Sequence, residues 1–291
     1  MYNRFFGLEL DPFNVNPDPR FLFNTNHTEE ALACLNYGIT KRKGFILLTG
    51  EVGTGKTTLL YTLLEKLRSE KVATAFVFNP RLDPDQFLDF MLTDFGIPPV
   101  SSSKSQVLSR LNQWLLDRYS SGETAALIVD EAQHLQPDVL EEIRLLTNLE
   151  TATDKLLQIV LCGQPELEAT LKKPGLRQLR QRITLRAQTR PLTPDETAEY
   201  INRRLRIAGA TDPIFTPSSI SSIFRFSRGI PRLVNLLCEH ALISAYADQR
   251  KSVEAVTIEN IAIEFGLEED LPLVDEAGLV DAAAAKLKRQ Q

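Results

Sequence analysis

The stretch that decides the fold runs from Phe45 to Leu63 and reads FILLTGEVGTGKTTLLYTL. It opens with an apolar run typical of a buried strand, passes through a glycine-rich turn, and ends with the periodicity of an amphipathic helix. Its middle, Gly50 to Thr57, matches the pattern G-x-x-x-x-G-K-[ST] in the strand-to-helix context that the pattern requires. The stretch therefore predicts a loop that holds the phosphates of a nucleotide.

The residue types of this loop suit an anion. Glycines allow backbone conformations and a close approach that a Cβ would block, so amide N–H groups can turn toward the phosphates. The following helix directs the positive end of its dipole to the same place. We expect Lys56 to reach the β- and γ-phosphates and Thr57 to bind Mg²⁺. The residues predicted to bind the nucleotide here are Gly50, Glu51, Val52, Gly53, Thr54, Gly55, Lys56, Thr57 and Thr58.

A second chemical site follows another apolar run. In AALIVDEAQ, the acids Asp130 and Glu131 come directly after a strand-like segment. The carboxyl ends of parallel strands meet at one edge of a sheet, where the phosphate loop would also lie. We expect Asp130 to hold Mg²⁺ through water and Glu131 to orient and activate the attacking water, so the pair indicates hydrolysis. The alternative, two solvated acids that begin a helix, is disfavoured by their coincidence with the phosphate loop.

The order of apolar and amphipathic segments indicates the fold class. Four short apolar runs, FILLT, VATAFVF, AALIVD and LLQIVLC, each precede a helix-like stretch, and a fifth, ITLRAQ, is less apolar. This alternation predicts an α/β fold, a three-layer αβα P-loop domain on a parallel sheet with ITLRAQ as an outer strand. Thr193 to Glu196 then form a capping box, and the strand pattern stops, which predicts an all-helical lid domain. The expected divisions are 1–43 (N-terminal linker and helix), 44–190 (nucleotide-binding domain), 191–266 (helical lid) and 267–291 (tail).

Composition places the chain among ordinary globular proteins. Its 291 residues are 43% hydrophobic and 24% charged, enough for one large core and a smaller unit. A net charge of -5 argues against a surface built wholly around nucleic acid, although a local basic face remains open. The three cysteines lie scattered in apolar segments without metal spacing, which favours reduced core residues over a zinc site. No apolar run suits a signal peptide or a membrane span, so we expect a cytoplasmic protein that neither spans a membrane nor is exported by itself.

Polar and basic residues after these strands suggest further contacts with the nucleotide. Gln164 follows LLQIVLCG and would stand level with Glu131 if the two strands are neighbours. No acid lies between Lys172 and Arg190, whereas seven residues there are basic. This segment is a basic surface, a source of arginines for a neighbouring subunit's nucleotide, or a nucleic-acid contact. Arg232 stands in the first turn of a helix, where it opposes the helix dipole and so indicates an anion nearby.

Five sequence features together resemble an AAA+ ATPase: GEVGTGKT, LIVDEA, a polar residue after the fourth strand, arginines before the fifth, and GIPR. The patterns MYNRFFGL, PDPRFLF and EALACLNYGI narrow the resemblance to the ATPase domain of the general secretion pathway protein A group and to related pilus-biogenesis and exopolysaccharide-locus ATPases. The resemblance implies that Gln164, where the family usually has Asn or Thr, is the first sensor. It implies that Arg182 or Arg180 is an arginine finger acting in trans and that Arg232 is the second sensor. It also implies ATP and Mg²⁺ as ligands and a homo-oligomer as the assembly.

These observations leave three functions to compare. The leading one is an ATPase that couples hydrolysis to conformational change in an envelope secretion or pilus assembly machinery. The alternative is a DNA-binding AAA+ regulator of the transposition target-selection type, favoured by the basic segment 172–190 and by Arg203 and Arg204, and opposed by the net charge and the lack of an appended helix-turn-helix. A third is an ATP-binding scaffold with negligible turnover. A helicase is disfavoured, because the mostly helical residues after Glu131 leave no room for a second αβ domain.

Overall fold

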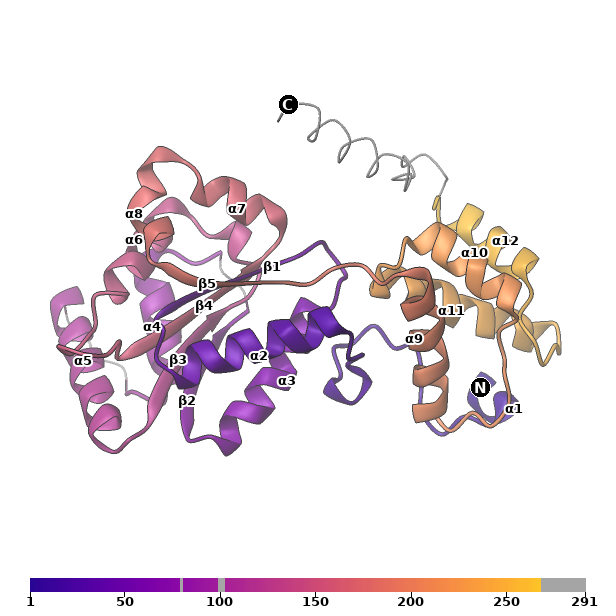
Figure 1. Cartoon of the computed structure of the whole chain (residues 1–291), viewed down its shortest axis with the longest axis horizontal. Coiled ribbons are helices and arrows are strands. Elements are labelled where there is room, and N and C mark those ends of the chain that lie inside the picture. Colours follow the sequence, from indigo (N-terminus) through magenta and orange to yellow (C-terminus); the bar gives the residue numbers. More distant parts are fainter. Residues whose placement is uncertain (79–80, 99–102, 268–291) are drawn as a thin grey trace, which may run out of the picture.

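The computed structural model describes residues 1–78, 81–98 and 103–267. Within these residues the chain forms a sheet covered by helices and a smaller helical unit, joined by extended segments (Figure 1). The predicted tail, 267–291, lies outside the described residues apart from its first residue. None of the helices in the described residues combines the length and the apolar composition that a bilayer-crossing segment needs.

A five-stranded parallel sheet forms the centre of the larger unit, with its strands in the order β2-β3-β4-β1-β5. The strands are β1 (Phe45–Thr49), β2 (Val72–Val77), β3 (Thr124–Val129), β4 (Leu157–Gly163) and β5 (Ile183–Gln188). The apolar runs of the sequence form these strands, and the less apolar fifth run lies at an edge, as predicted. Because β1 pairs with β4, and β4 with β3, the ends of the three strands that carry the predicted site lie side by side.

Helices cover both faces of the sheet, which confirms the three-layer αβα fold (Figure 1). One face packs against α2 (Asn26–Thr40) and α3 (Lys56–Ser69). The other face packs against α4 (Pro84–Asp94), α5 (Lys104–Ser120), α6 (Pro137–Leu146), α7 (Pro165–Leu171) and α8 (Arg177–Gln181). In β1, Ile46 and Leu48 enter the first core while Phe45 and Leu47 enter the second. Packing on both faces therefore fixes the strand from which the glycine loop departs.

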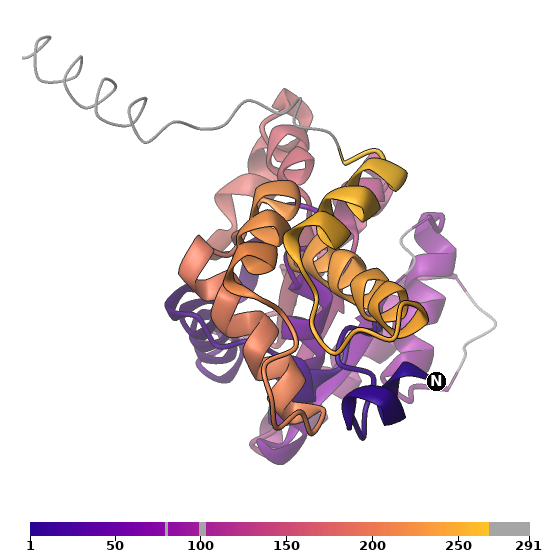
Figure 2. The same ribbon diagram turned by 90° about the vertical axis from the view of Figure 1, so that its right-hand side faces the viewer.

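The smaller unit is the helical C-terminal region that the sequence predicts, and it has a hydrophobic core of its own. It consists of α9 (Pro194–Ile207), α10 (Pro217–Ser227), α11 (Pro231–Ala247) and α12 (Ala255–Glu264). The predicted capping box begins α9, since the Glu196 amide donates to Thr193 Oγ1 at 3.2 Å and the Thr193 amide donates to Glu196 Oε2 at 2.8 Å. Seen from the side of this unit, its helices lie in front of the sheet (Figure 2).

The N-terminal residues connect the two units. Helix α1 (Tyr2–Phe6) lies against the helical unit, and Tyr2 belongs to its core (Figure 1). The Tyr2 hydroxyl also donates to the carboxylate of Glu239 on α11 at 2.8 Å. The chain then returns through a segment that we call the strap, residues 12–23, which includes the 3₁₀ helix η1 (Pro19–Phe21), and enters α2 on the sheet. The first forty residues thus contribute to the core of the helical unit and to the core between the sheet and α2 and α3.

Candidate functional site

A cavity of about 410 Å³ lies between the glycine loop, the strap and the helical unit. Small-molecule sites in proteins typically enclose roughly 300–1,000 Å³, so the cavity has a suitable size for a nucleotide. The strap and α2 contribute Asn14, Val15, Asn16, Pro17, Asp18, Phe21, Leu22, Phe23 and Thr28; the glycine loop and α3 contribute Val52, Gly53, Thr54, Gly55, Lys56, Thr57, Thr58 and Leu59. The strand ends contribute Glu131, Gln164, Thr189 and Arg190, and the helical unit contributes Leu192, Tyr200, Arg204, Pro231, Arg232 and Asn235. Residues that are distant in sequence thus line one cavity.

The glycine loop has the backbone shape that its sequence predicts. Gly53 and Gly55 have φ angles of 80° and 91°, in the left-handed region that glycine enters at little cost. Gly55 is also the N-cap of α3, so the helix begins directly on the loop. Its N-terminus, with the positive end of the helix dipole, therefore faces the cavity that Gly55 and Lys56 line.

Lys56 is buried within the loop with only 6% of its surface exposed. Its Nζ donates to the carbonyl oxygens of Gly50 and Glu51, each at 2.9 Å. These two residues do not line the cavity; they hold the lysine that does. Because neither partner is a carboxylate, the positive charge of Lys56 is not neutralised and is available to a phosphate.

The two predicted Mg²⁺ ligands are in contact. Thr57 Oγ1 at the start of α3 donates to Asp130 Oδ2 at the end of β3, at 2.8 Å. Asp130 is 4% exposed, and its other oxygen accepts the Glu131 amide at 2.9 Å. A hydroxyl and a carboxylate are the hard oxygen donors that Mg²⁺ prefers, and both stand beside the phosphate loop. The residues present therefore fit Mg²⁺ bound together with a nucleotide.

Glu131 and Gln164 lie at neighbouring strand ends. The prediction that they stand level depended on β3 and β4 being adjacent, and the two strands are paired. Both side chains line the cavity. Gln164 is the N-cap of α7, whose first turn follows β4. The sequence interpretation did not single out Gln133, whose side chain hydrogen-bonds to both residues.

Arg232 brings the helical unit onto the glycine loop. Its backbone amide, in the first turn of α11, donates to the carbonyl oxygen of Gly53 at 3.2 Å. A Cβ on Gly53 would lie 2.7 Å from the Cβ of Arg232, so the loop and the helix touch closely. The exposed side chain of Arg232 lines the cavity, which agrees with the anion that its unfavourable place in the helix indicates.

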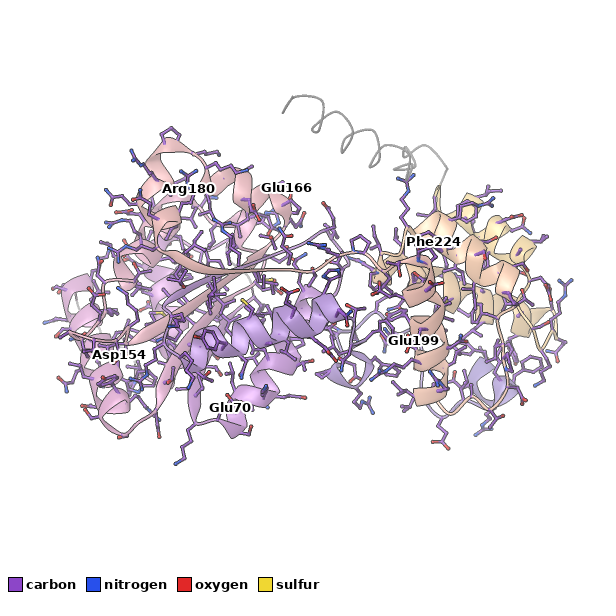
Figure 3. The ribbon with its side chains drawn as sticks, in the orientation of Figure 1. Glu70, Asp154, Glu166, Arg180, Glu199 and Phe224 are labelled. Atoms are coloured by element: carbon purple, nitrogen blue, oxygen red, sulfur yellow. The ribbon has the colours of Figure 1, made fainter. Side chains whose placement is uncertain are left out.

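Arg180 and Arg182 do not line this cavity. Arg180 is exposed on α8, over the core on the side away from the helical unit (Figure 3). Arg182 follows α8, and its Nη1 lies 3.4 Å from the carbonyl oxygen of Thr147. That one of these arginines acts in trans, in the site of a neighbouring molecule, therefore stays a prediction.

Arg204 has a different place from the one that the DNA-binding alternative assumed. It is 7% exposed, and its guanidinium donates to the carbonyl oxygen of Pro12 and to the hydroxyl of Tyr200. The guanidinium carbon also lies 4.5 Å from the ring centroid of Phe21. Arg204 therefore holds the strap against α9, and its use as a DNA contact was wrong because the sequence does not show which face of α9 is buried.

Burial keeps two groups around the site in their neutral forms. It raises the pKa of the Cys162 thiol, on β4, and the charge of nearby Asp130 raises that pKa further. Burial also raises the pKa of the Tyr200 phenol, which donates to Asn235 Oδ1 at 2.9 Å. Cys162 is therefore an unreactive core thiol, and Tyr200 stays a hydrogen-bond donor at neutral pH.

Comparison with known proteins identifies a matching sequence family. A family model described as an AAA domain matches residues 39–171. General secretion pathway protein A from Aeromonas hydrophila is 47% identical over 248 residues, which are 85% of this chain and 45% of that protein. The chain thus spans less than half the length of this relative.

Several solved structures share the fold. The Aeropyrum pernix ORC2 protein, in its ADPNP–ADP complexes, has a TM-score of 0.67 at 17% identity and covers 88% of this chain and 72% of its own. Cdc6p from Pyrobaculum aerophilum has a TM-score of 0.67 at 18% identity, over 87% of this chain and 70% of its own. The RuvB Holliday junction branch migration motor of Thermotoga maritima has a TM-score of 0.55 at 16% identity, over 85% of this chain and 72% of its own. At such identities these likenesses show the fold alone.

Proposed function

Since the chain is a member of the AAA+ P-loop NTPases, we propose that it binds ATP and Mg²⁺ in the cavity, hydrolyses the γ-phosphate bond, and uses the energy to move its helical unit against its core. The observation that carries the proposal is the Thr57–Asp130 hydrogen bond beside Lys56 and Glu131. This contact supports the proposal because the residues expected to bind phosphate, bind Mg²⁺ and activate water then lie at one edge of the sheet.

Each polar group has a defined task in this mechanism. Lys56 and the loop amides hold the β- and γ-phosphates. Thr57 and, through water, Asp130 would hold Mg²⁺, which would offset phosphate charge when bound. Glu131 accepts a proton from the attacking water. Gln164 contacts the γ-phosphate or that water from the neighbouring strand, and Arg232 contributes positive charge from the helical unit. Arg182 or Arg180 does the same from an adjacent protomer.

The shared cavity supports the proposal that turnover moves the helical unit. Its walls come from the sheet unit and from the helical unit, and the backbone amide of Arg232 donates to the carbonyl oxygen of Gly53 in the glycine loop. A triphosphate binds residues on both walls, and loss of the γ-phosphate removes contacts that favour one arrangement of the helical unit over another. The conformational change therefore follows from differential binding of substrate and product.

A phosphate-release assay on wild type and on Glu131→Gln tests the hydrolysis. We expect wild type to turn over and the variant to be slower by about 10²–10⁴-fold, the typical contribution of a general base. Glu65→Gln, an exposed glutamate on α3, is the matched control and should retain the wild-type rate. Equal, very slow release by wild type and Glu131→Gln would instead support the ATP-binding scaffold.

We propose that the protein acts with a secretion or pilus assembly machinery of the cell envelope, because the 47% identical relative is named for the general secretion pathway. In this reading the chain is cytoplasmic, assembles as a homo-oligomer, and meets the inner membrane through a secretion or pilus partner. Light scattering with and without ATP tests the assembly, because arginines offered in trans require neighbouring protomers. A chain that stays monomeric in ATP would contradict the trans role.

One observation on the basic segment 172–190 favours the DNA-binding alternative. Lys172 and Lys173, directly after α7, and Arg177 and Arg180, on α8, are exposed, so this segment does present basic side chains to solvent. A salt-dependent shift of duplex DNA in ATP, lost on Arg177→Glu, would favour DNA binding. Arg204 is unsuitable for this test because it is buried.

A further inference from the structure

Gln133 connects the two strand ends of the site through its side chain. It lies in the 3₁₀ helix η2 (Ala132–His134), directly after β3. Its Nε2 donates to Glu131 Oε2, and its Oε1 accepts the backbone amide of Gln164 at 3.1 Å. One amide group therefore joins the carboxylate at the end of β3 to the first residue after β4.

The end of β4 is shaped to accept this side chain. A Cβ on Gly163 would lie 2.8 Å from Gln133 Oε1 and 3.3 Å from the Gln133 backbone nitrogen. A larger residue at this position would therefore displace the bridging amide. The absence of a side chain at Gly163 allows Gln133 to reach the Gln164 amide.

The side chain of Glu131 is only partly enclosed, so a hydrogen bond to its carboxylate restricts its orientation. Its backbone has a φ of 52°, an uncommon value for a residue other than glycine, and its side chain is only partly buried on the cavity. A general base has to stay within hydrogen-bond reach of one water, and small misplacements cost rate. A neutral amide donor restricts the carboxylate without neutralising its charge.

We infer that Gln133 is a positioning residue that sets the orientation of the Glu131 carboxylate and makes it depend on the position of Gln164. This inference rests on the hydrolysis proposed above and deepens it. Gln164 lines the cavity, and its backbone amide donates to Gln133 Oε1. A ligand that shifts the first turn of α7 therefore also shifts Gln133. The orientation of the Glu131 carboxylate then depends on whether Gln164, after β4, contacts a ligand.

Steady-state ATP hydrolysis by Gln133→Met tests this role. Methionine keeps the length of the side chain and removes both hydrogen bonds. We expect kcat to fall about tenfold while the affinity for a fluorescent ATP analogue stays within about twofold, because the residue acts on the base and not on the phosphates. Gln136→Met, at an exposed position three residues further along, is the control and should match wild type.

A double-mutant comparison separates positioning from a structural role. In the Glu131→Gln background, Gln133→Met should slow the residual rate by less than about twofold, because a residue that acts through Glu131 has no further effect once the base is gone. Gln133→Glu keeps the size and the acceptor but repels Glu131, so it should be slower than Gln133→Met. It serves as the second variant if the methionine form folds poorly, as judged by thermal unfolding.

The outcomes separate this inference from the proposed function. Wild-type turnover together with an unchanged kcat in Gln133→Met and Gln133→Glu would overturn the positioning role and leave ATP hydrolysis standing. An undiminished loss in the Glu131→Gln background would also overturn it. No turnover by wild type would overturn both.

Discussion

The two walls of the cavity are built in different ways. The wall on the sheet comes from a contiguous loop and from the ends of neighbouring strands, and its polar groups meet through hydrogen bonds such as that from Thr57 to Asp130. The opposite wall comes from the strap and from α9 and α11, whose residues are almost two hundred positions apart, such as Pro12 and Arg204. The first wall therefore carries chemistry in a local motif, whereas the second depends on two cores being correctly packed. Substitutions should separate them: the first should lose function at constant stability, and the second should lose stability.

The largest expected effect is on the sheet wall. Lys56→Ala should weaken ATP binding by at least about 100-fold, because charge-assisted contacts to phosphate contribute about 1.5–3 kcal/mol each and 1.4 kcal/mol is a factor of ten. A titration with a fluorescent ATP analogue and Mg²⁺ measures it. Lys66→Ala, exposed on the same helix, should bind like wild type. An unchanged affinity for Lys56→Ala would refute the phosphate loop.

On the opposite wall, Arg204→Met should lower the free energy of unfolding by about 2–4 kcal/mol, because it leaves the buried partners of the guanidinium without their donor. Denaturant unfolding measures the change. The exposed Arg206→Met on the same helix is the control and should stay within about 0.5 kcal/mol of wild type. Equal stabilities of the two variants would contradict the strap as a structural part of the second wall.

Arg232 sharpens the comparison, since it lies on the second wall but faces the phosphate loop. Arg232→Ala should lower kcat about tenfold, because one cationic contact to the transition state is removed, and should leave the unfolding free energy within about 0.5 kcal/mol. Steady-state kinetics and denaturant unfolding measure the two effects. Arg206→Ala, outside the cavity, is the control. A loss of stability without a loss of rate would place Arg232 with the structural residues of its wall.

The smallest expected effect concerns the far end of the N-terminal segment. Tyr2→Phe removes the hydrogen bond to Glu239 and should cost about 1 kcal/mol of stability with no change in ATP affinity. Thermal unfolding with and without nucleotide measures both. Tyr37→Phe, on an exposed face of α2, should leave the melting temperature unchanged. A marked change in affinity for Tyr2→Phe would show that the two walls are more tightly coupled than their contacts indicate.

The sequence predicted the sheet wall because its signals are local. Gly53, Gly55 and Lys56 stand in one turn, so their spacing alone specifies the backbone that the structure shows. Asp130 and Glu131 were predicted from a strand end, which needs only the rule that parallel strands share an edge. Gln133 was missed because its role depends on a contact with Gln164 across two strands.

The second wall could not be predicted in the same way. Tyr200 and Arg204 lie one helical turn apart, which shows that they share a face but not that this face meets residues 12–23. The basic character of Arg203 and Arg204 favoured a nucleic-acid contact, whereas Arg204 is buried because a distant part of the chain supplies its acceptors. Such a contact is a property of packing and not of composition.

By itself, the sequence determined which apolar runs form strands, the phosphate loop, the acids near it and the helical character of the C-terminal unit, because each depends on propensity and spacing over a few residues. Only the tertiary structure decided that the strap and the helical unit enclose the loop, that Arg204 is internal, and that Gln133 links Glu131 to α7. These features arise where surfaces from different parts of the chain exclude water together, and no single segment contains the information for that contact.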